Sequence, residues 1–302
     1  MSRRIRPPVK SKDRRSHATK FSLVLGGGGA RGLAHIGVLR VLEREGLLPA
    51  LIVGTSMGAI VGGMYAQCLN AGVVEERITR LIRSQPFRRI VLDAFAHEGA
   101  PDSLGTVSAL YGRMKRGYGM LKSVWSPGIV EAPTLVDFLS HLMDDVPFGK
   151  CRIPFASVSC DLLTGDEVIC TTGPMLNAIA ASSAIPGVVS PVRLKGRWLV
   201  DGAPTSMVPV DAALQISHRP VLAVTVTRSV RGKRRMTNAI DVVLRAGAIA
   251  RLRLTEYNLK NAAVVLRPEV GSFGWAEFES IGRFVAEGER VAESALRKIR
   301  AL

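Results

Sequence analysis

Residues 21–32 read FSLVLGGGGARG and residues 51–58 read LIVGTSMG, and these two stretches decide the fold. Each is a short apolar run that ends in glycines, and each is followed by apolar residues at the spacing of a buried helix face. This order predicts strand, turn and helix twice in succession, which makes a right-handed βαβ unit with two parallel strands. We expect strands over 21–25 and 50–55 and helices over 31–45 and 57–70.

Strand and helix patterns continue to alternate after this unit, which indicates one α/β domain over residues 21–302. We expect a mainly parallel central sheet with helices on both faces, that is, a three-layer sandwich. The further elements that we expect are strands over 155–160, 167–171, 220–227 and 263–266, a hairpin over 192–200 around Lys195-Gly196, helices over 134–143, 174–183, 208–217 and 238–260, and a C-terminal helical stripe from Phe278 to Ile299 that packs in the core.

Residues 46–74 contain no charged side chain, so a membrane span is an alternative interpretation of this stretch. However, Pro49 and several glycines interrupt it, and a β-rich run at 51–53 precedes a helix-like one. We therefore expect a buried parallel strand that leads into a buried helix.

Basic residues are in excess, and their distribution is uneven. The chain of 302 residues has a formal net charge of +16, and residues 1–20 hold eight Lys or Arg against Asp13. This composition predicts a disordered basic arm at 1–20. Residues 84–131 scatter aromatic and basic side chains among Gly and Pro, which predicts an irregular, lid-like insertion. The basic balance as a whole suits an anionic lipid, a nucleic acid or an acidic protein as partner. The insertion favours an anionic membrane surface over nucleic acid, because no RNA-binding or zinc-finger motif accompanies it.

The four cysteines are widely spaced and form no CxxC pair, so we expect free thiols in a reducing compartment. No apolar run follows the basic arm, so a secretory signal is not indicated. We therefore expect a cytoplasmic protein, with peripheral contact to the inner face of the membrane. No acidic cluster suggests a ligand set, so we expect neither a metal nor a cofactor. The oligomeric state is not indicated.

The glycines from Gly27 to Gly32 are compatible with three kinds of loop. A dinucleotide-binding loop requires an acidic residue near the end of the second strand, which here reads Val53-Gly54-Thr55-Ser56. A P-loop requires Gly-Lys-Ser/Thr, which Arg31-Gly32-Leu33 does not supply. An oxyanion loop that opens a helix requires only free backbone N–H groups, and this interpretation fits best.

The second motif, Gly54-Thr55-Ser56-Met57-Gly58, has the GxSxG pattern of a nucleophile on a sharp strand-to-helix turn. The Ser56 hydroxyl would be the nucleophile, and the N–H of Met57 would be an oxyanion donor. Parallel pairing of the two strands would bring both glycine turns to the carboxyl edge of the sheet.

The residues alone leave the base that activates Ser56 open. His218 follows Asp201 in the order of a Ser-Asp-His triad, but it lies at the entrance of a predicted strand rather than at its end. His35 lies in the first helix, where a surface or packing role is expected. Asp201 is the alternative base, although Asp201-Gly202 by itself is mainly a hairpin-turn signal.

The chain resembles the patatin-like phospholipases in three motifs that occur in the same order. These are Gly27-Gly28-Gly29-Ala30-Arg31-Gly32, the elbow at 54–58, and Asp201-Gly202-Ala203. The stretch Ala181-Ser182-Ser183-Ala184-Ile185-Pro186 is similar to the family's segment before its aspartate. The similarity runs from about residue 21 to about residue 226 and is weak in the basic arm and at 86–130.

This resemblance implies a Ser56–Asp201 dyad in which Asp201 takes the serine proton directly. Ser56 would attack the ester carbonyl of a phospholipid or related lipid, and an acyl-enzyme would form. The N–H groups of Gly28, Gly29 and Met57 would hold the oxyanion, and Arg31 would hold the loop or a lipid phosphate. An acyltransferase with the same dyad and a non-catalytic, membrane-associated regulator with the same fold are the alternatives.

Overall fold

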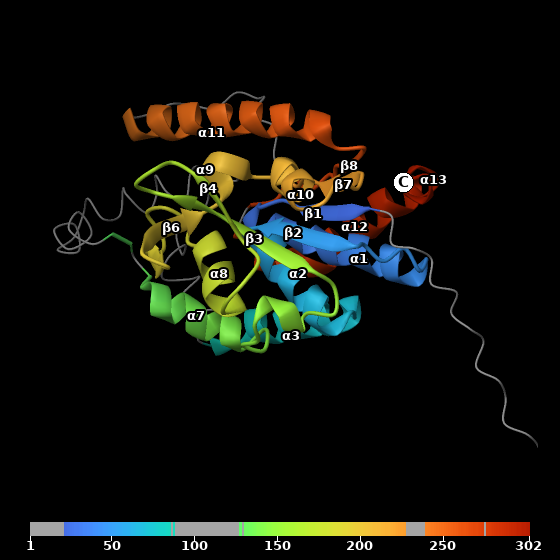
Figure 1. Cartoon of the computed structure of the whole chain (residues 1–302), viewed down its shortest axis with the longest axis horizontal. Coiled ribbons are helices and arrows are strands. Elements are labelled where there is room, and N and C mark those ends of the chain that lie inside the picture. The colour runs from blue at the N-terminus through green and yellow to red at the C-terminus, as the bar shows by residue number, and fades with distance from the viewer. Residues whose placement is uncertain (1–20, 86, 88–126, 129, 228–238, 275) are drawn as a thin grey trace, which may run out of the picture.

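The computed structural model describes residues 21–302 except 86, 88–126, 129, 228–238 and 275 (Figure 1). The predicted basic arm at 1–20 and most of the predicted insertion at 84–131 lie outside the described residues. The described strands are β1 (Ser22–Leu25), β2 (Leu51–Thr55), β3 (Phe155–Asp161), β4 (Glu167–Cys170), β5 (Val192–Leu194), β6 (Arg197–Asp201), β7 (Val221–Val224) and β8 (Val264–Leu266). The described helices are α1 (Ala34–Arg44), α2 (Met57–Cys68), α3 (Ala71–Arg83), α7 (Ala132–Ser140), α8 (Met175–Ser182), α9 (Ala203–Ser206), α10 (Val210–Ile216), α11 (Ala239–Asn258), α12 (Ile281–Ser294) and α13 (Leu296–Arg300), with 3-10 turns η1 (Gly29–Leu33), η2 (Phe148–Lys150), η3 (Leu259–Asn261) and η4 (Phe278–Ser280).

The described strands form one sheet in the order β5-β6-β3-β2-β1-β7-β8, and β4 also pairs with β3. The four pairings from β3 to β8, namely β2 with β3, β1 with β2, β1 with β7 and β7 with β8, are parallel. The pairings of β3 with β4, β3 with β6 and β5 with β6 are antiparallel. The predicted mainly parallel sheet is therefore confirmed, and so is the β5–β6 hairpin, in which Lys195 and Gly196 have positive φ.

Helices cover both faces of this sheet, as the alternation of buried strand residues requires. Leu23, Leu25 and Ile52 point to the face that α1, α2, α3, α7, α8 and α12 cover. Val24 and Val53 point to the opposite face, which α10 covers. Figure 1 shows α9, α10 and α11 above the sheet and α2, α3, α7 and α8 below it, so the three-layer arrangement is confirmed.

Helices α1 and α12 cross with their backbones in direct contact, although about 240 residues separate them in the sequence. A Cβ atom on Gly37 would lie 2.0 Å from the Val285 carbonyl oxygen, and one on Gly288 would lie 1.9 Å from the Ala34 carbonyl oxygen. Only glycine fits at both positions, because any side chain would separate the helices. Arg40 also pairs with Glu289 across this contact at 3.1 Å. The core-packing role predicted for the C-terminal stripe is confirmed, although the helix breaks at Ala295.

The structure differs from the sequence-based prediction at two helices. Helix α3 was not predicted, and it begins directly after Asn70, whose side chain caps it by accepting the Val73 N–H at 3.0 Å. Asp201-Gly202 is not a hairpin turn, because helix α9 starts directly after it. The uncharged stretch at 46–74 consists of β2, α2 and the start of α3, as expected, and no helix in the described part of the chain is long and apolar enough to cross a bilayer.

Candidate active site

The two glycine turns lie against each other at the carboxyl ends of β1 and β2. A Cβ atom on Gly27 would lie 3.1 Å from the Ser56 Cβ, and one on Gly32 would lie 2.6 Å from the Met57 Cγ. Parallel pairing of Leu25 with Gly54 brings the ends of the two strands side by side. The first turn therefore packs directly on the residues of the second.

Ser56 occupies a strained turn between β2 and α2. Its φ of 54° and ψ of −124° are unusual for a residue with a side chain, and its side chain is nearly buried. The turn is close to its neighbours as well, since a Cβ on Gly58 would lie 2.0 Å from the Leu25 carbonyl oxygen. A Cβ on Gly54 would lie 2.4 Å from the Gly58 carbonyl oxygen. Both framing glycines of the GxSxG motif are thus required by close approach, and the predicted strained turn is present.

Ser182, to which no specific role was assigned from the sequence, holds the backbone of this turn. Its Oγ accepts the Ser56 N–H at 3.0 Å and donates to the Val158 carbonyl at 2.6 Å. Val158 belongs to β3, which pairs with both β2 and β6. One buried hydroxyl therefore ties the serine turn to the strand beside Asp201. Only the family resemblance at 181–186 could have drawn attention to it.

Three backbone N–H groups near Ser56 are available. Among the described residues, the N–H groups of Gly28, Gly29 and Met57 have no hydrogen-bond acceptor. Gly27 differs, because its N–H donates to the Met207 carbonyl at 2.9 Å and is therefore occupied. Gly29 has a positive φ of 59°, which glycine adopts easily. Free donors at the start of a helix favour a negative charge, so the loop has the chemistry of an anion site.

Asp201 ends β6, next to β3, and is 3% exposed. Its N–H donates to the Ala184 carbonyl at 2.9 Å, and its Oδ1 accepts the Ala203 N–H at 2.8 Å. Burial raises the pKa of Asp201 from 3.8 to about 6, although the Ser56 hydroxyl, the Ala203 N–H and the positive charge of Arg251 each oppose this effect. The structure therefore brings Ser56 to a buried carboxylate that is more basic than an ordinary aspartate.

The glycine next to Asp201 is also fixed by close packing. A Cβ on Gly202 would lie 2.5 Å from the Val158 carbonyl oxygen and 3.1 Å from the Thr55 Cγ2. Thr55 in turn donates its hydroxyl to the Ser206 carbonyl at 2.9 Å. The segment after Asp201 is thus packed directly on the strand end that precedes Ser56.

Comparison with known proteins decides the family. The model of the family described as patatin-like phospholipase matches residues 23–214, which include all the candidate residues described above. The chain belongs to the patatin-like phospholipase family. An uncharacterized NTE family protein of Mycobacterium tuberculosis is 32% identical over 228 residues, which are 76% of this chain and 55% of that protein.

Two further comparisons show how far the likeness of this patatin-like chain extends. A lysophospholipase of Mycosarcoma maydis is 27% identical over 245 residues, which cover 74% of this chain and 11% of that protein. Among solved structures, VipD from Legionella pneumophila aligns with a TM-score of 0.48 and 12% identity, over 94% of this chain and 67% of VipD. The chain spans about half the length of the mycobacterial relatives that it matches.

Arg251 of the patatin-like chain was not singled out from the sequence, and it lies near the site. It projects from α11, and its guanidinium is partly desolvated, which lowers its pKa, while the charge of Asp201 opposes that effect. Helix α11 contacts α9, which begins directly after Asp201. The sequence offered no signal, because about 50 residues separate Arg251 from Asp201.

His35 and Arg31 support the glycine loop of the patatin-like chain from beneath. His35 is fully buried, and its Nε2 lies 2.7 Å from the Gly26 carbonyl oxygen, which requires an Nε2–H donor. Burial lowers the pKa of His35 to about 4, so the ring is neutral near pH 7. Arg31 is also buried, and its Nε donates to the Gly28 carbonyl at 3.4 Å. The predicted packing role of His35 is thus confirmed, and a surface role is wrong.

His218 is exposed directly before β7, at the amino edge of the sheet. Because β7 is parallel to β1, this edge is opposite to the one at which Ser56 lies. The Ser-Asp-His triad that the sequence left open is therefore not formed with His218.

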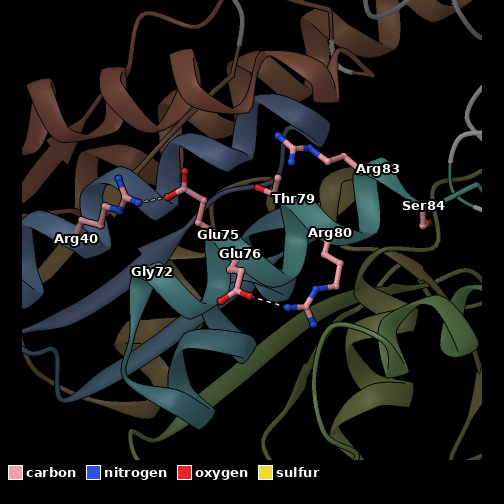
Figure 2. A pocket seen from close by; sticks show the side chains of 8 residues that line it. All are labelled: Arg40, Gly72, Glu75, Glu76, Thr79, Arg80, Arg83 and Ser84. Atoms are coloured by element: carbon pink, nitrogen blue, oxygen red, sulfur yellow. Dashed lines mark hydrogen bonds and ion pairs between the residues drawn. The ribbon is translucent and has the colours of Figure 1, made fainter.

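A hollow of about 680 Å³ between α1 and α3 contains none of the residues of the candidate site. Figure 2 shows its lining, in which Arg40 pairs with Glu75 and Arg80 pairs with Glu76. Four of its five charged side chains form these two pairs, and Arg83 is the fifth. The hollow offers no nucleophile or base arrangement comparable to Ser56 and Asp201.

Proposed function

We propose that the protein hydrolyses acyl ester bonds of phospholipids or related lipids, with Ser56 as nucleophile and Asp201 as the base. One observation carries this proposal: the Ser56 hydroxyl interacts with a buried carboxylate of raised pKa, beside unpaired backbone N–H groups. Acyl transfer requires a nucleophile, a proton acceptor and donors for the developing oxyanion, and these three are present together.

In the first half-reaction, Ser56 Oγ forms a bond to the ester carbonyl carbon, and its proton passes to Asp201. The N–H groups of Gly28, Gly29 and Met57 donate to the carbonyl oxygen as it becomes negative. Loss of one such donor costs about 10²–10³-fold in rate in comparable sites. When the oxyanion collapses, the bond to the alcohol breaks and Asp201 returns the proton to the leaving oxygen.

In the second half-reaction, water attacks the acyl-Ser56 ester. Asp201 takes one proton from the water, and the same N–H groups bind the second oxyanion. Collapse releases the fatty acid and returns the proton to Ser56. If an alcohol replaces water in this step, the same dyad acts as an acyltransferase, so the acceptor is decided by what enters the site.

The environment of Asp201 supports its role as a base. An ordinary aspartate, with a pKa near 3.8, accepts a hydroxyl proton poorly, whereas a pKa of about 6 lies closer to the operating pH. At pH 7 the carboxyl is still mostly ionised and able to accept. We assign Arg31 to holding the loop, since its Nε donates to Gly28.

The substrate class rests on the family and on the lysophospholipase among the relatives. A lipid ester with a long acyl chain is the substrate that we propose, and contact with an anionic membrane would supply it.

Labelling with an alkyl fluorophosphonate tests the proposal. The wild-type chain should be labelled and should release fatty acid from phospholipid or lysophospholipid. Ser56→Ala should abolish both, and Asp201→Asn should slow both, whereas Ser217→Ala at the end of α10 is a matched serine change that should alter neither. Hydrolysis by the purified Ser56→Ala protein would refute the dyad. Labelling without release to water, but with transfer to an added alcohol, would identify a transferase.

A further inference from the structure

Large apolar side chains are exposed mainly on α11. Nine large hydrophobic residues in the described part of the chain are exposed, and five of them lie on this helix. Their exposed fractions range from 38% to 70%, and the residues are Val242, Val243, Ile249, Leu254 and Tyr257. Such a concentration on one element marks an interaction surface, whereas single exposed apolar residues do not.

These side chains share one face of the helix. Val242, Ile249 and Tyr257 follow one another at intervals of seven and eight residues, and the exposed Ala246 and Arg253 fall between them. This spacing keeps residues on the same side of an α-helix. The opposite side carries the buried Asp241, Thr255 and Asn258. Helix α11 therefore has an inner face anchored to the domain and an outer face that is mostly apolar, defined here as the α11 outer face.

The helix that carries the α11 outer face packs next to the candidate active site. Figure 1 shows α11 as the outermost element above α9 and α10. Helix α11 contacts α9, which starts after Asp201, and Arg251 on α11 acts electrostatically on Asp201. Arg251 shares the inner side of the helix with Thr255 and Asn258, so a bilayer bound to the α11 outer face would be separated from the Ser56–Asp201 pair by this one helix.

The charge around α11 favours an anionic occupant. Arg253 is exposed within the outer face, and Lys260 lies 5.5 Å from the Tyr257 ring centre. The exposed Glu256 is neutralised by Arg267 through two bonds of 2.8 Å. The sequence that leads into the helix, residues 228–238, contains five Lys or Arg and no Asp or Glu. A second copy of this chain, with a net charge of +16, would bring like charge to the same face.

Apolar side chains on one face with cationic groups around them are typical of a helix that lies in the interface of an anionic bilayer. We propose that the α11 outer face is the surface by which the protein lies on an anionic lipid bilayer. This inference rests on the proposed function, because a lipid hydrolase must reach its substrate at a lipid surface. Binding to vesicles can be measured independently of ester hydrolysis, so it tests this inference separately.

The test compares the full-length chain with a double variant, Val243→Glu with Tyr257→Glu. Both side chains are exposed, so the fold should persist, and thermal unfolding checks this. Ile216→Glu on α10 is the matched control, because Ile216 is an exposed apolar residue at the amino edge of the sheet. Binding is measured by sedimentation with vesicles of phosphatidylglycerol and phosphatidylcholine and with vesicles of phosphatidylcholine alone.

We expect the wild-type and Ile216→Glu proteins to bind the anionic vesicles, less tightly as salt increases, and the double variant to bind at least tenfold more weakly. The double variant should hydrolyse a soluble short-chain ester at the wild-type rate but vesicle lipid more slowly. Equal binding by wild type and double variant, or no binding by wild type, overturns the inference. The inference is also overturned if the double variant differs from the wild type only by forming a smaller oligomer, as measured by sedimentation velocity. Vesicle binding through α11 without hydrolysis of any ester supports the surface and refutes the proposed function alone.

Discussion

Replacing Asp201 by Asn is expected to stabilise the fold and to remove activity, and both effects have one cause. The carboxyl is buried, and its pKa is raised from 3.8 to about 6. The unfolded chain ionises the same group near 3.8, so the folded state holds the proton more tightly. At neutral pH, ionisation of Asp201 therefore destabilises the folded protein, whereas a neutral amide avoids this penalty and can still accept the Ala203 N–H.

The size of the effect follows from the two pKa values. A tenfold change in acid dissociation is worth about 1.4 kcal/mol, so the rise from 3.8 to about 6 corresponds to about 3 kcal/mol of unfolding free energy. Below pH 3.8 both states are protonated and the penalty is absent. It grows as the pH rises to about 6 and is constant above. The stability gain of Asp201→Asn should thus be about 1 kcal/mol at pH 4.5 and about 3 kcal/mol at pH 7.5.

Urea unfolding of the two proteins, followed by circular dichroism at both pH values, measures this gain. Asp211→Asn on α10 controls for the loss of one negative charge. The same protonation should give kcat/KM of the wild type an acid limb near pH 6, with the rate increasing as the pH rises. Ester hydrolysis by Asp201→Asn should fall about 10²–10⁴-fold, since the amide accepts no proton. An Asn variant that is equally stable at pH 7.5, or a gain that does not change with pH, would refute the reasoning.

Three further substitutions test the frame of the site. Ser182→Ala leaves the N–H of the candidate nucleophile without its acceptor, which should cost about 1–3 kcal/mol in urea unfolding and lower kcat, and Ser182→Thr should retain most of both. Gly58→Ala would set a Cβ 2.0 Å from the Leu25 carbonyl oxygen, so fluorophosphonate labelling should disappear; labelling at the wild-type rate would contradict the geometry. His35→Gln can still donate to Gly26, whereas His35→Leu cannot, so only the Leu variant should lose about tenfold in kcat at unchanged KM. Equal kcat in the Gln and Leu variants would show that the ring matters only for packing.

The part of the site that the two glycine turns form could be predicted because its sequence signals are local. Apolar runs, glycines and helical spacing all occur within residues 21–70, and parallel pairing of adjacent strands then brings the two turns together. Even the strain at Ser56 follows from the glycines around it. Gly27 shows the limit of such reasoning, since only the fold reveals that its N–H is already bonded to Met207.

The placement of Asp201 beside Ser56 depends on the order of strands in the sheet, which local sequence patterns do not contain. Asp201 reaches Ser56 because β6 pairs with β3 and β3 with β2, and an Asp-Gly pair taken alone points to a hairpin. Ser182 and Arg251 act from elements far away in the sequence. Helix α3 was missed because its buried face is narrow, with only Ala71, Val74 and Ile78 fully buried. For α11, apolar residues occur on both faces, so the sequence cannot tell which face meets the domain.

The crossing of α1 and α12 has a consequence for the glycine loop. The family match ends at residue 214, yet α12, at 281–294, fits against the helix that carries His35 beneath the glycine loop. A helix beyond the family match is thus mechanically continuous with the glycine loop. Displacement of α12 is therefore expected to loosen that loop from behind, at a distance from Ser56 and Asp201.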